Sequence, residues 1–281
     1  MTTKRYRSVL FMPASNARAL EKAKTIAADA LVFDLEDAVQ PDAKILAREQ
    51  AVAAANSGDY GTKEVLIRSN APGTPWWKDD LKAICQSGCD GLVVPKVSSV
   101  GDVMGIENSM FSVDAPHHMP FWAMVETASA CLNIRKIVES SRRLKGLMMG
   151  ANDLSLELRA RRTKDRLPLM TGMGLTILAA RANDLVVLDA VYNDIKDHEG
   201  FRAECMQALE MGFDGKTLIH PAQVEIANTA FSPSEAEIED AKSLIAAYEV
   251  ALAAGQGVAL YQGKMIEELH VREAKRVLSF T

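Results

Sequence analysis

The chain has 281 residues, of which 48% are hydrophobic and 25% are charged, a composition typical of a soluble globular protein. Its net charge of −5 argues against non-specific binding to nucleic acid, and no run of about 18 apolar residues predicts a membrane span. The basic first residues precede too short an apolar stretch for a signal peptide, and the four cysteines form no CxxC pair. We therefore expect a cytoplasmic protein with reduced thiols and neither a nucleic-acid nor a membrane partner.

Short apolar segments rich in β-branched residues alternate with helical patterns along the chain. The eight predicted strands lie at residues 7–13, 30–36, 64–70, 91–97, 120–126, 144–150, 186–192 and 215–221. Apolar strands that are each followed by an amphipathic helix are typical of a parallel sheet covered by helices. Eight such repeats favour a closed (β/α)8 TIM barrel, whose usual size is about 250 residues. An open, doubly wound sheet is the alternative, and the strand count and even spacing weaken it.

The chain continues beyond the eighth predicted strand. Residues 232–255 predict a long helix that begins at Ser232 or Ser234 and ends at Gly255, and residues 255–280 predict a hairpin-like turn and a final helix. We expect a catalytic barrel over residues 1–230 and a C-terminal helical arm over residues 231–281. The arm either packs against a neighbouring subunit or caps its own barrel.

Charged side chains gather where the predicted strands end, which is the end of a TIM barrel that carries active sites. They are Glu36, Asp37, Arg68, Lys96, Glu126, Asp153, Asp189 or Asp194, and His220. Each has an ordinary explanation when taken alone: helix capping for the acids, a salt bridge for the arginine, and solvation for the lysine. Together they form a cluster of carboxylates that would repel one another without a cation, because like charges raise one another's pKa.

Magnesium is the metal that this pattern favours. The chain has no His-x-His, no HExxH and no cysteine cluster, so zinc and iron are poorly supported. Mg²⁺ takes one or two protein carboxylates and completes its shell with waters and substrate oxygens. Glu126 and Asp153 suffice as direct ligands, which leaves Glu36 and Asp37 to hold metal-bound water. Asp34 is expected only to pair within the barrel.

Seven motifs in order resemble the citrate lyase β-subunit-like family, which includes the HpcH/HpaI aldolases and malyl-CoA lyases. They are RSxLFMP, DLEDAV, IRSN with PWW, VVPK, VET, GANDL and GFDGKTLIHPAQ, and the similarity covers about residues 6 to 280. DLEDAV and GKTLIHP together in a (β/α)8 pattern are specific, whereas VET or GAND alone is weak.

The resemblance implies a Mg²⁺-dependent carbon–carbon lyase that acts on a 3-hydroxyacyl-CoA thioester such as malyl-CoA, giving acetyl-CoA and glyoxylate. By motif position, Glu126 and Asp153 match the metal ligands of the family, Arg68 matches its substrate-binding and catalytic arginine, and Glu126 also faces substrate. Members are commonly homotrimers or homohexamers in which the C-terminal arm reaches the active site of a neighbour.

One position departs from the family pattern. The family often has an aspartate after GKMI and a proline shortly after it, whereas this chain has Glu267 and Leu269. A glutamate keeps the catalytic carboxylate but moves it by one methylene, which exceeds the tolerance of about 0.5 Å for a preorganised site. Hydrolysis of the malyl thioester is therefore an alternative to the lyase reaction. A β-type subunit that works with an acyl-carrier partner is a third hypothesis.

Overall fold

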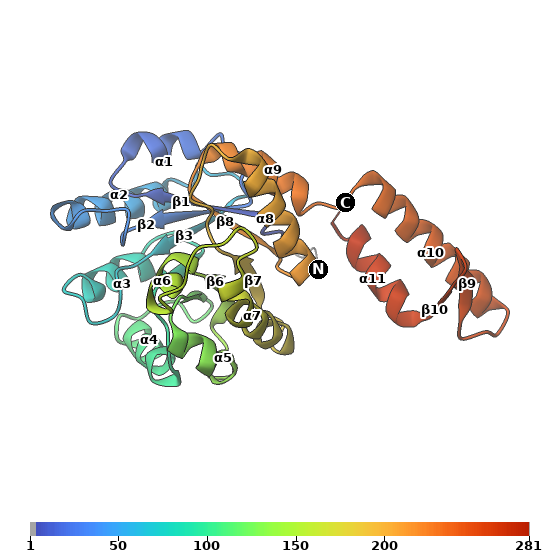
Figure 1. Ribbon diagram of the computed structural model, residues 1–281. Coiled ribbons are helices and arrows are strands. Elements are labelled where there is room, and N and C mark those ends of the chain that lie inside the picture. Colours follow the sequence, from blue (N-terminus) through green and yellow to red (C-terminus); the bar gives the residue numbers. More distant parts are fainter. Residues whose placement is uncertain (1–3, 281) are drawn as a thin grey trace. The chain divides into compact units, whose positions relative to one another are not determined.

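Eight parallel strands close into a barrel in the computed structural model, which describes residues 4–280 (Figure 1). The strands are β1 Ser8–Pro13, β2 Ala30–Asp34, β3 Glu64–Arg68, β4 Gly91–Val94, β5 Phe121–Val125, β6 Leu144–Met149, β7 Val186–Asp189 and β8 Gly215–Leu218. Each follows its predecessor in space, and β1 pairs with β8 to close the sheet. The prediction of a (β/α)8 barrel is confirmed, and each strand lies within the segment predicted for it.

Helices surround the strands on the outside of the barrel (Figure 1). They are α1 Ala17–Ala23, α2 Lys44–Ser57, α3 Trp77–Cys85, α4 Val100–Ser112, α5 Ala128–Glu139, α6 Ala151–Glu157, α7 Met170–Ala182, α8 His198–Met211 and α9 Val224–Ala230, with 3₁₀ turns η1 Pro41–Ala43, η2 Leu167–Leu169 and η3 Pro221–Gln223. Several begin where a side chain accepts a hydrogen bond from the first turn, as Ser99, Thr127 and Asp197 do.

The inside of the barrel is a packed core and not a pore. Alternating strand residues such as Val32, Leu66 and Val93 fill it, with Trp122 as its largest buried side chain. The Trp122 ring meets the Tyr6 ring edge to face, with centroids 5.1 Å apart. Because the indole also presses on the backbone of β6, a side chain at Gly146 would overlap it. The packed interior leaves the carboxyl ends of the strands as the place for a site.

Residues 6–229 form this barrel unit, and residues 4–5 with 230–280 form a second compact unit. The second unit contains α10 Glu235–Ala253, a hairpin of β9 Ala259–Tyr261 and β10 Lys264–Ile266, and α11 Glu268–Leu278. Helix α10 begins at Ser234, whose hydroxyl and the Glu237 carboxylate form a reciprocal capping box. The long helix, the hairpin and the final helix expected from the sequence are all present. Among residues 4–280, no helix is long and apolar enough to cross a membrane.

Candidate active site

A cavity of about 340 Å³ lies at the carboxyl ends of the barrel strands. Strands β1, β2, β3, β5, β6 and β8 and the loops that follow them contribute to its wall. Its charged lining consists of Asp34, Asp37, Arg68, Glu126 and Asp153. Of the side chains predicted from the strand ends, Asp37, Arg68, Glu126 and Asp153 line this cavity, and Glu36 lies beside them against Arg68.

Arg68 is fixed by Asp34. Its Nε donates to Asp34 Oδ1 and its Nη2 to Asp34 Oδ2, both at 2.7 Å, in a bidentate pair that is almost fully buried. The two residues are direct partners in the register of β2 and β3, so the sheet itself sets this geometry. The guanidinium also lies over the Phe11 ring, 5.1 Å from its centroid. Asp34 occupies Nε and Nη2 of the guanidinium, and the remaining Nη1 donates to Met124 Sδ at 3.5 Å.

The DLEDAV segment folds around the same aspartate. Asp34 accepts backbone hydrogen bonds from Glu36 and Ala38 at 2.8 and 3.0 Å, which turns the chain so that two more carboxylates face Arg68. Glu36 Oε2 lies 2.9 Å from Arg68 Nη1 without the alignment of a hydrogen bond, and Asp37 Oδ2 lies 3.6 Å from it. Burial raises the pKa of Glu36 to about 8, with Arg68 opposing and Asp37 adding to the shift.

Glu126 follows β5 and is held by backbone. It is 2% exposed, and its Oε1 accepts a hydrogen bond of 2.7 Å from the amide of Lys96. Lys96 has φ of 57°, an uncommon conformation for a residue other than glycine, and this backbone places its N–H in the site. A side chain at Gly150 would overlap Glu126, so the glycine of GAND permits the close approach of β6. Burial raises the pKa of Glu126 to about 7, with the Lys96 amide and Arg68 opposing the shift and the nearby Asp153 adding to it.

Asp153 lies in the first turn of α6 and not at its cap. Helix α6 begins after Gly150 without a side-chain cap, so the expectation that Asp153 merely caps the helix is wrong. Glu126 also has no capping role, because Thr127 caps α5 by accepting from Ala130 at 3.0 Å. Both carboxylates are thus left to the cavity that they line.

The donor set fits a magnesium ion. Within residues 4–280, no group of three or more His, Cys, Asp or Glu side chains is arranged to hold a metal. Mg²⁺ requires only one or two protein carboxylates, because it keeps several waters and binds substrate oxygens. Glu126 and Asp153 line one cavity, and the charge of Asp153 helps to raise the pKa of Glu126, a repulsion that a cation relieves.

Three other charged residues singled out from the sequence have different surroundings. Asp189 is buried against Lys216 and Arg166. His220 starts η3, and its Nδ1 accepts the Ala222 amide at 3.2 Å. Glu267 belongs to the second unit, where it is exposed and precedes α11. Its catalytic role stays a prediction.

Asp34 was expected to pair within the barrel, and its partner is Arg68. Lys44, beside the site, was not expected from the sequence: its Nζ donates to the carbonyl oxygens of Leu35 and Glu36 at 2.7 Å each and lies over the Trp76 ring. Burial lowers the pKa of this amine. An apolar-to-acidic transition in a strand signals Asp34, but nothing local to the sequence signals Lys44.

A (β/α)8 barrel with clustered carboxylates and one clamped arginine at the carboxyl ends of its strands defines a class of metal-assisted barrel enzymes. The family model described as HpcH/HpaI aldolase/citrate lyase matches residues 7–221. The chain belongs to this family, and the resemblance drawn from its motifs is confirmed.

Two relatives and one solved structure illustrate the similarity. A (3S)-malyl-CoA thioesterase of Cereibacter sphaeroides is 50% identical over 98% of this chain and 94% of its own length. A citrate lyase subunit beta of Leuconostoc mesenteroides is 33% identical over 97% of this chain and 92% of its own. The structure of CitE from Mycobacterium tuberculosis in complex with magnesium, acetoacetate and coenzyme A gives a TM-score of 0.83 at 27% identity, covering 99% and 98% of the two chains.

Proposed function

We propose that this chain is a Mg²⁺-dependent enzyme that hydrolyses a 3-hydroxyacyl-CoA thioester of the malyl-CoA type. The observation that carries the proposal is the excess of carboxylates around one clamped arginine in a single cavity. The magnesium and coenzyme A held by CitE, and the 50% identity to a (3S)-malyl-CoA thioesterase, support the metal, the substrate class and the hydrolytic reaction.

In this proposal the carboxylates divide between two tasks. Glu126 and Asp153 hold the metal directly, while Glu36 and Asp37 accept hydrogen bonds from waters around it. Bound Mg²⁺ supplies Lewis-acid stabilisation of substrate oxygens. The backbone N–H of Lys96 keeps Glu126 oriented through its 2.7 Å hydrogen bond, so the ligand geometry exists before substrate arrives.

Arg68 binds the substrate oxygen on which negative charge develops. Asp34 fixes the plane of its guanidinium through two hydrogen bonds, and Nη1, which now lies beside Glu36, donates to the substrate oxygen in this proposal. The low exposure of Arg68, 6%, strengthens this charge–charge interaction because little water screens it. The same arrangement stabilises a tetrahedral oxyanion in hydrolysis or an enolate in carbon–carbon cleavage.

Carbon–carbon cleavage of malyl-CoA to acetyl-CoA and glyoxylate is the second candidate. The similarity to a citrate lyase subunit beta favours it. This reaction needs an acid/base at the carbon that leaves, and Glu267 is the residue proposed for that role. The same relative supports a third possibility, in which the thioester is carried by an acyl-carrier protein.

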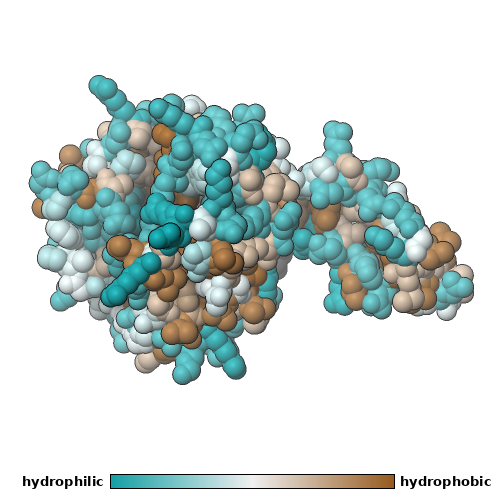
Figure 2. Space-filling view, viewed as in Figure 1, coloured by the Kyte–Doolittle hydropathy of each residue, from teal (hydrophilic) through white to brown (hydrophobic). Residues whose placement is uncertain are grey.

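We further propose a homotrimer or homohexamer in which the C-terminal unit packs against a neighbouring copy. Figure 2 shows apolar side chains toward the end of this unit, where the β9–β10 hairpin lies. Leu260 and Met265 of the hairpin are 76% and 70% exposed, a large apolar area for strands that face solvent. Burial of this surface against another copy removes it from water.

One assay separates the three activities. Purified protein is incubated with Mg²⁺ and malyl-CoA, and free thiol and glyoxylate are followed in parallel. Thiol without glyoxylate supports hydrolysis, and glyoxylate without thiol supports the lyase. If neither product forms from malyl-CoA but a malyl-carrier protein is turned over, the result supports the partner-dependent subunit. Absence of any turnover with both thioesters would contradict the proposed function.

A further inference from the structure

A second cavity of about 360 Å³ lies beside the candidate active site, and the proposed reaction does not use it. Its walls come from α6, from the loop over residues 159–166, from the loop after β7 and from α8. Ala151, Asn152, Val191 and Asn193 line both cavities. The two asparagine side chains hydrogen-bond to each other at 2.7 Å and so form part of the wall between the cavities.

The loop over residues 159–166 is anchored to the barrel. Arg166 Nη1 lies 2.7 Å from both carboxylate oxygens of the buried Asp189, and its Nε donates to Gln207 Oε1 at 2.8 Å. Gln207 in turn donates to the carbonyl oxygen of Asp165 at 2.9 Å. Arg162 is fixed as well, because it donates to Asn152 Oδ1 at 3.0 Å. The basic side chains of this loop therefore start from a fixed backbone.

Three acids line the cavity, and each has a partner within the fold. Asp197 accepts from the Gly200 amide at 2.9 Å and from the Tyr192 hydroxyl at 2.7 Å, and these two hydrogen bonds lower its pKa, with a smaller contribution from the charge of Lys164. Glu204 lies 2.7 Å from the ammonium of the buried Lys216. Asp194 accepts from the Lys196 amide at 3.1 Å.

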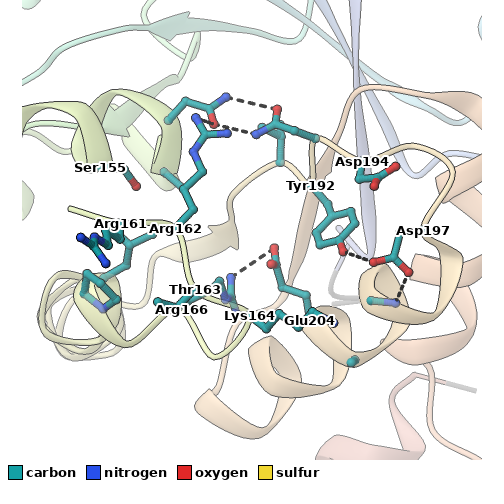
Figure 3. A pocket seen from close by; sticks show the side chains of 18 residues that line it. Ser155, Arg161, Arg162, Thr163, Lys164, Arg166, Tyr192, Asp194, Asp197 and Glu204 are labelled. Carbon is teal, nitrogen blue, oxygen red and sulfur yellow. Dashed lines mark hydrogen bonds and ion pairs between the residues drawn. The ribbon is translucent and has the colours of Figure 1, made fainter. Parts of the chain in front are cut away.

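The basic side chains on the opposite wall of the cavity have fewer hydrogen-bond and ion-pair partners than the acids. Figure 3 shows Arg161 and Arg162 on the side of the cavity opposite Tyr192 and Asp197. Among the described residues, Arg161 and Lys164 form no hydrogen bond and no ion pair within 4.0 Å, and at the floor Arg166 Nη2 is buried without a hydrogen-bond partner. Arg161, Arg162 and Lys164 thus gather beside a cavity in which Glu204 is paired with Lys216 and Asp197 with Tyr192, and this local excess of basic side chains favours an anionic ligand.

We propose that this cavity binds a small organic anion, either a phosphate ester or a polycarboxylate. The anionic group lies against Arg161, Arg162 and Lys164, where arginine and lysine supply charge-assisted hydrogen bonds. The body of the ligand packs on Tyr192 and Leu169, which give the remaining wall its apolar area. The volume is in the range of small-molecule sites, of about 300–1,000 Å³, and exceeds what a bare phosphate ion fills.

Isothermal titration calorimetry in magnesium-free buffer tests the proposal with two probes, citrate and adenosine 5′-monophosphate. The probe that binds identifies whether the carboxylate or the phosphate form of the anion is preferred. The double variant Arg161→Ala/Lys164→Ala is expected to weaken its Kd by at least about tenfold, because two charged donors are lost. The matched control Lys82→Ala/Lys136→Ala removes two exposed lysines on α3 and α5 and is expected to change Kd less than about twofold.

A second variant tests whether the anion binds in this cavity, and it does so without changing the charge of the protein. Ala203 lines the cavity from an exposed position on α8, so Ala203→Trp fills the space while the chain still folds, as circular dichroism checks. We expect this variant to abolish binding. Undiminished binding in Ala203→Trp, equal weakening by the lysine control, or no binding of either probe to the wild-type protein would each overturn the proposal.

Discussion

Two buried charge clusters of the barrel differ in their balance. In the cluster around Arg68, the four acids Asp34, Glu36, Asp37 and Glu126 face one guanidinium and the Lys96 ammonium, which lies 3.9 Å from Glu36 Oε1. In the cluster around Asp189, two acids meet two bases, because Glu204 joins Asp189 while Lys216 and Arg166 complete it. The charges of a balanced cluster neutralise one another, whereas a cluster with more acids than bases favours an added cation.

The pKa shifts of the carboxyl groups also differ between the two clusters. Burial raises the pKa of Glu36 to about 8 and of Glu126 to about 7, since one arginine does not offset several carboxylates. Burial also acts on Asp189, but Lys216 and Arg166 overcome it and lower the pKa of that carboxyl. An excess of acids therefore distinguishes the cluster at the candidate active site from the cluster around Asp189, in which acids and bases balance.

The largest expected effect comes from breaking the balanced cluster. Lys216 is fully buried, and its Nζ lies 2.6 Å from Asp189 Oδ2. Lys216→Met leaves two carboxylates facing one guanidinium and is expected to lower the free energy of unfolding by about 3–5 kcal/mol. Urea denaturation measures the loss, with the exposed Lys82→Met as a control that changes it by about 0.5 kcal/mol or less. A loss below about 1 kcal/mol would contradict the structural role.

The second-largest effect is expected from loss of the bidentate hydrogen bonds between Arg68 and Asp34 in the unbalanced cluster. Arg68→Lys keeps the charge but not the bidentate pair with Asp34, so kcat/KM is expected to fall by about 10²–10³-fold. The same change at Arg48, which pairs with the buried Asp80 outside the cavity, is expected to leave kcat/KM within about twofold. Wild-type turnover in Arg68→Lys would remove the proposed role of the guanidinium.

A smaller effect is expected from crowding a proposed metal ligand. Gly150→Ala places a methyl group against Glu126, which must move, at an expected cost of about 1–3 kcal/mol of unfolding free energy together with weaker Mg²⁺ activation. Gly174→Ala is the matched control: it meets nothing within 4 Å on α7 and is expected to stabilise the fold by about 0.5–1 kcal/mol. Equal Mg²⁺ activation in both variants would show that Glu126 tolerates displacement.

The smallest predicted effect is on how steeply the free energy of unfolding changes with pH. Because the folded-state pKa of Asp189 lies below its unfolded value, near 4, its contribution to stability is present above that value. The contribution is lost as the pH falls through the folded pKa. Unfolding free energies measured from pH 5 downward are expected to fall less steeply in Asp189→Asn than in the wild type. Identical slopes would show that this carboxyl does not titrate in the transition.

Much of the fold can be predicted from the sequence, because the alternation of apolar strands and amphipathic helices is a local pattern. Eight apolar segments at even spacing predict eight strands, and the capping pattern at Ser234 predicts the start of α10. Strands β2 to β8 end earlier than predicted, since residues after positions such as Asp34 and Arg68 turn into loops that line the candidate site. Backbone such as that of Lys96 with positive φ has no local signal, because tertiary contacts impose it.

The sequence predicts that the charged side chains at the strand ends lie close together, but it does not predict which of them pair with one another. Barrel topology alone brings the ends of the strands together, which is why Glu36, Asp37, Arg68, Glu126 and Asp153 were expected at one rim. The pairing of Asp34 with Arg68 depends on strand register, and that of Asp189 with Arg166 on a distant loop.

The reaction itself is less predictable than the site. The motifs favour a lyase, yet a relative at 50% identity is a thioesterase, and the same arginine and carboxylates serve either reaction.

Direct measurement of Mg²⁺ binding tests the central claim, that the unbalanced cluster is a cation site. Calorimetric titration of the wild-type protein with Mg²⁺ should show saturable binding, and Glu126→Gln/Asp153→Asn should weaken it at least tenfold, because about 1.4 kcal/mol suffices for that change. Glu204→Gln, which removes an acid of the balanced cluster, should bind Mg²⁺ as the wild type does. Unchanged binding in the double variant would contradict the account.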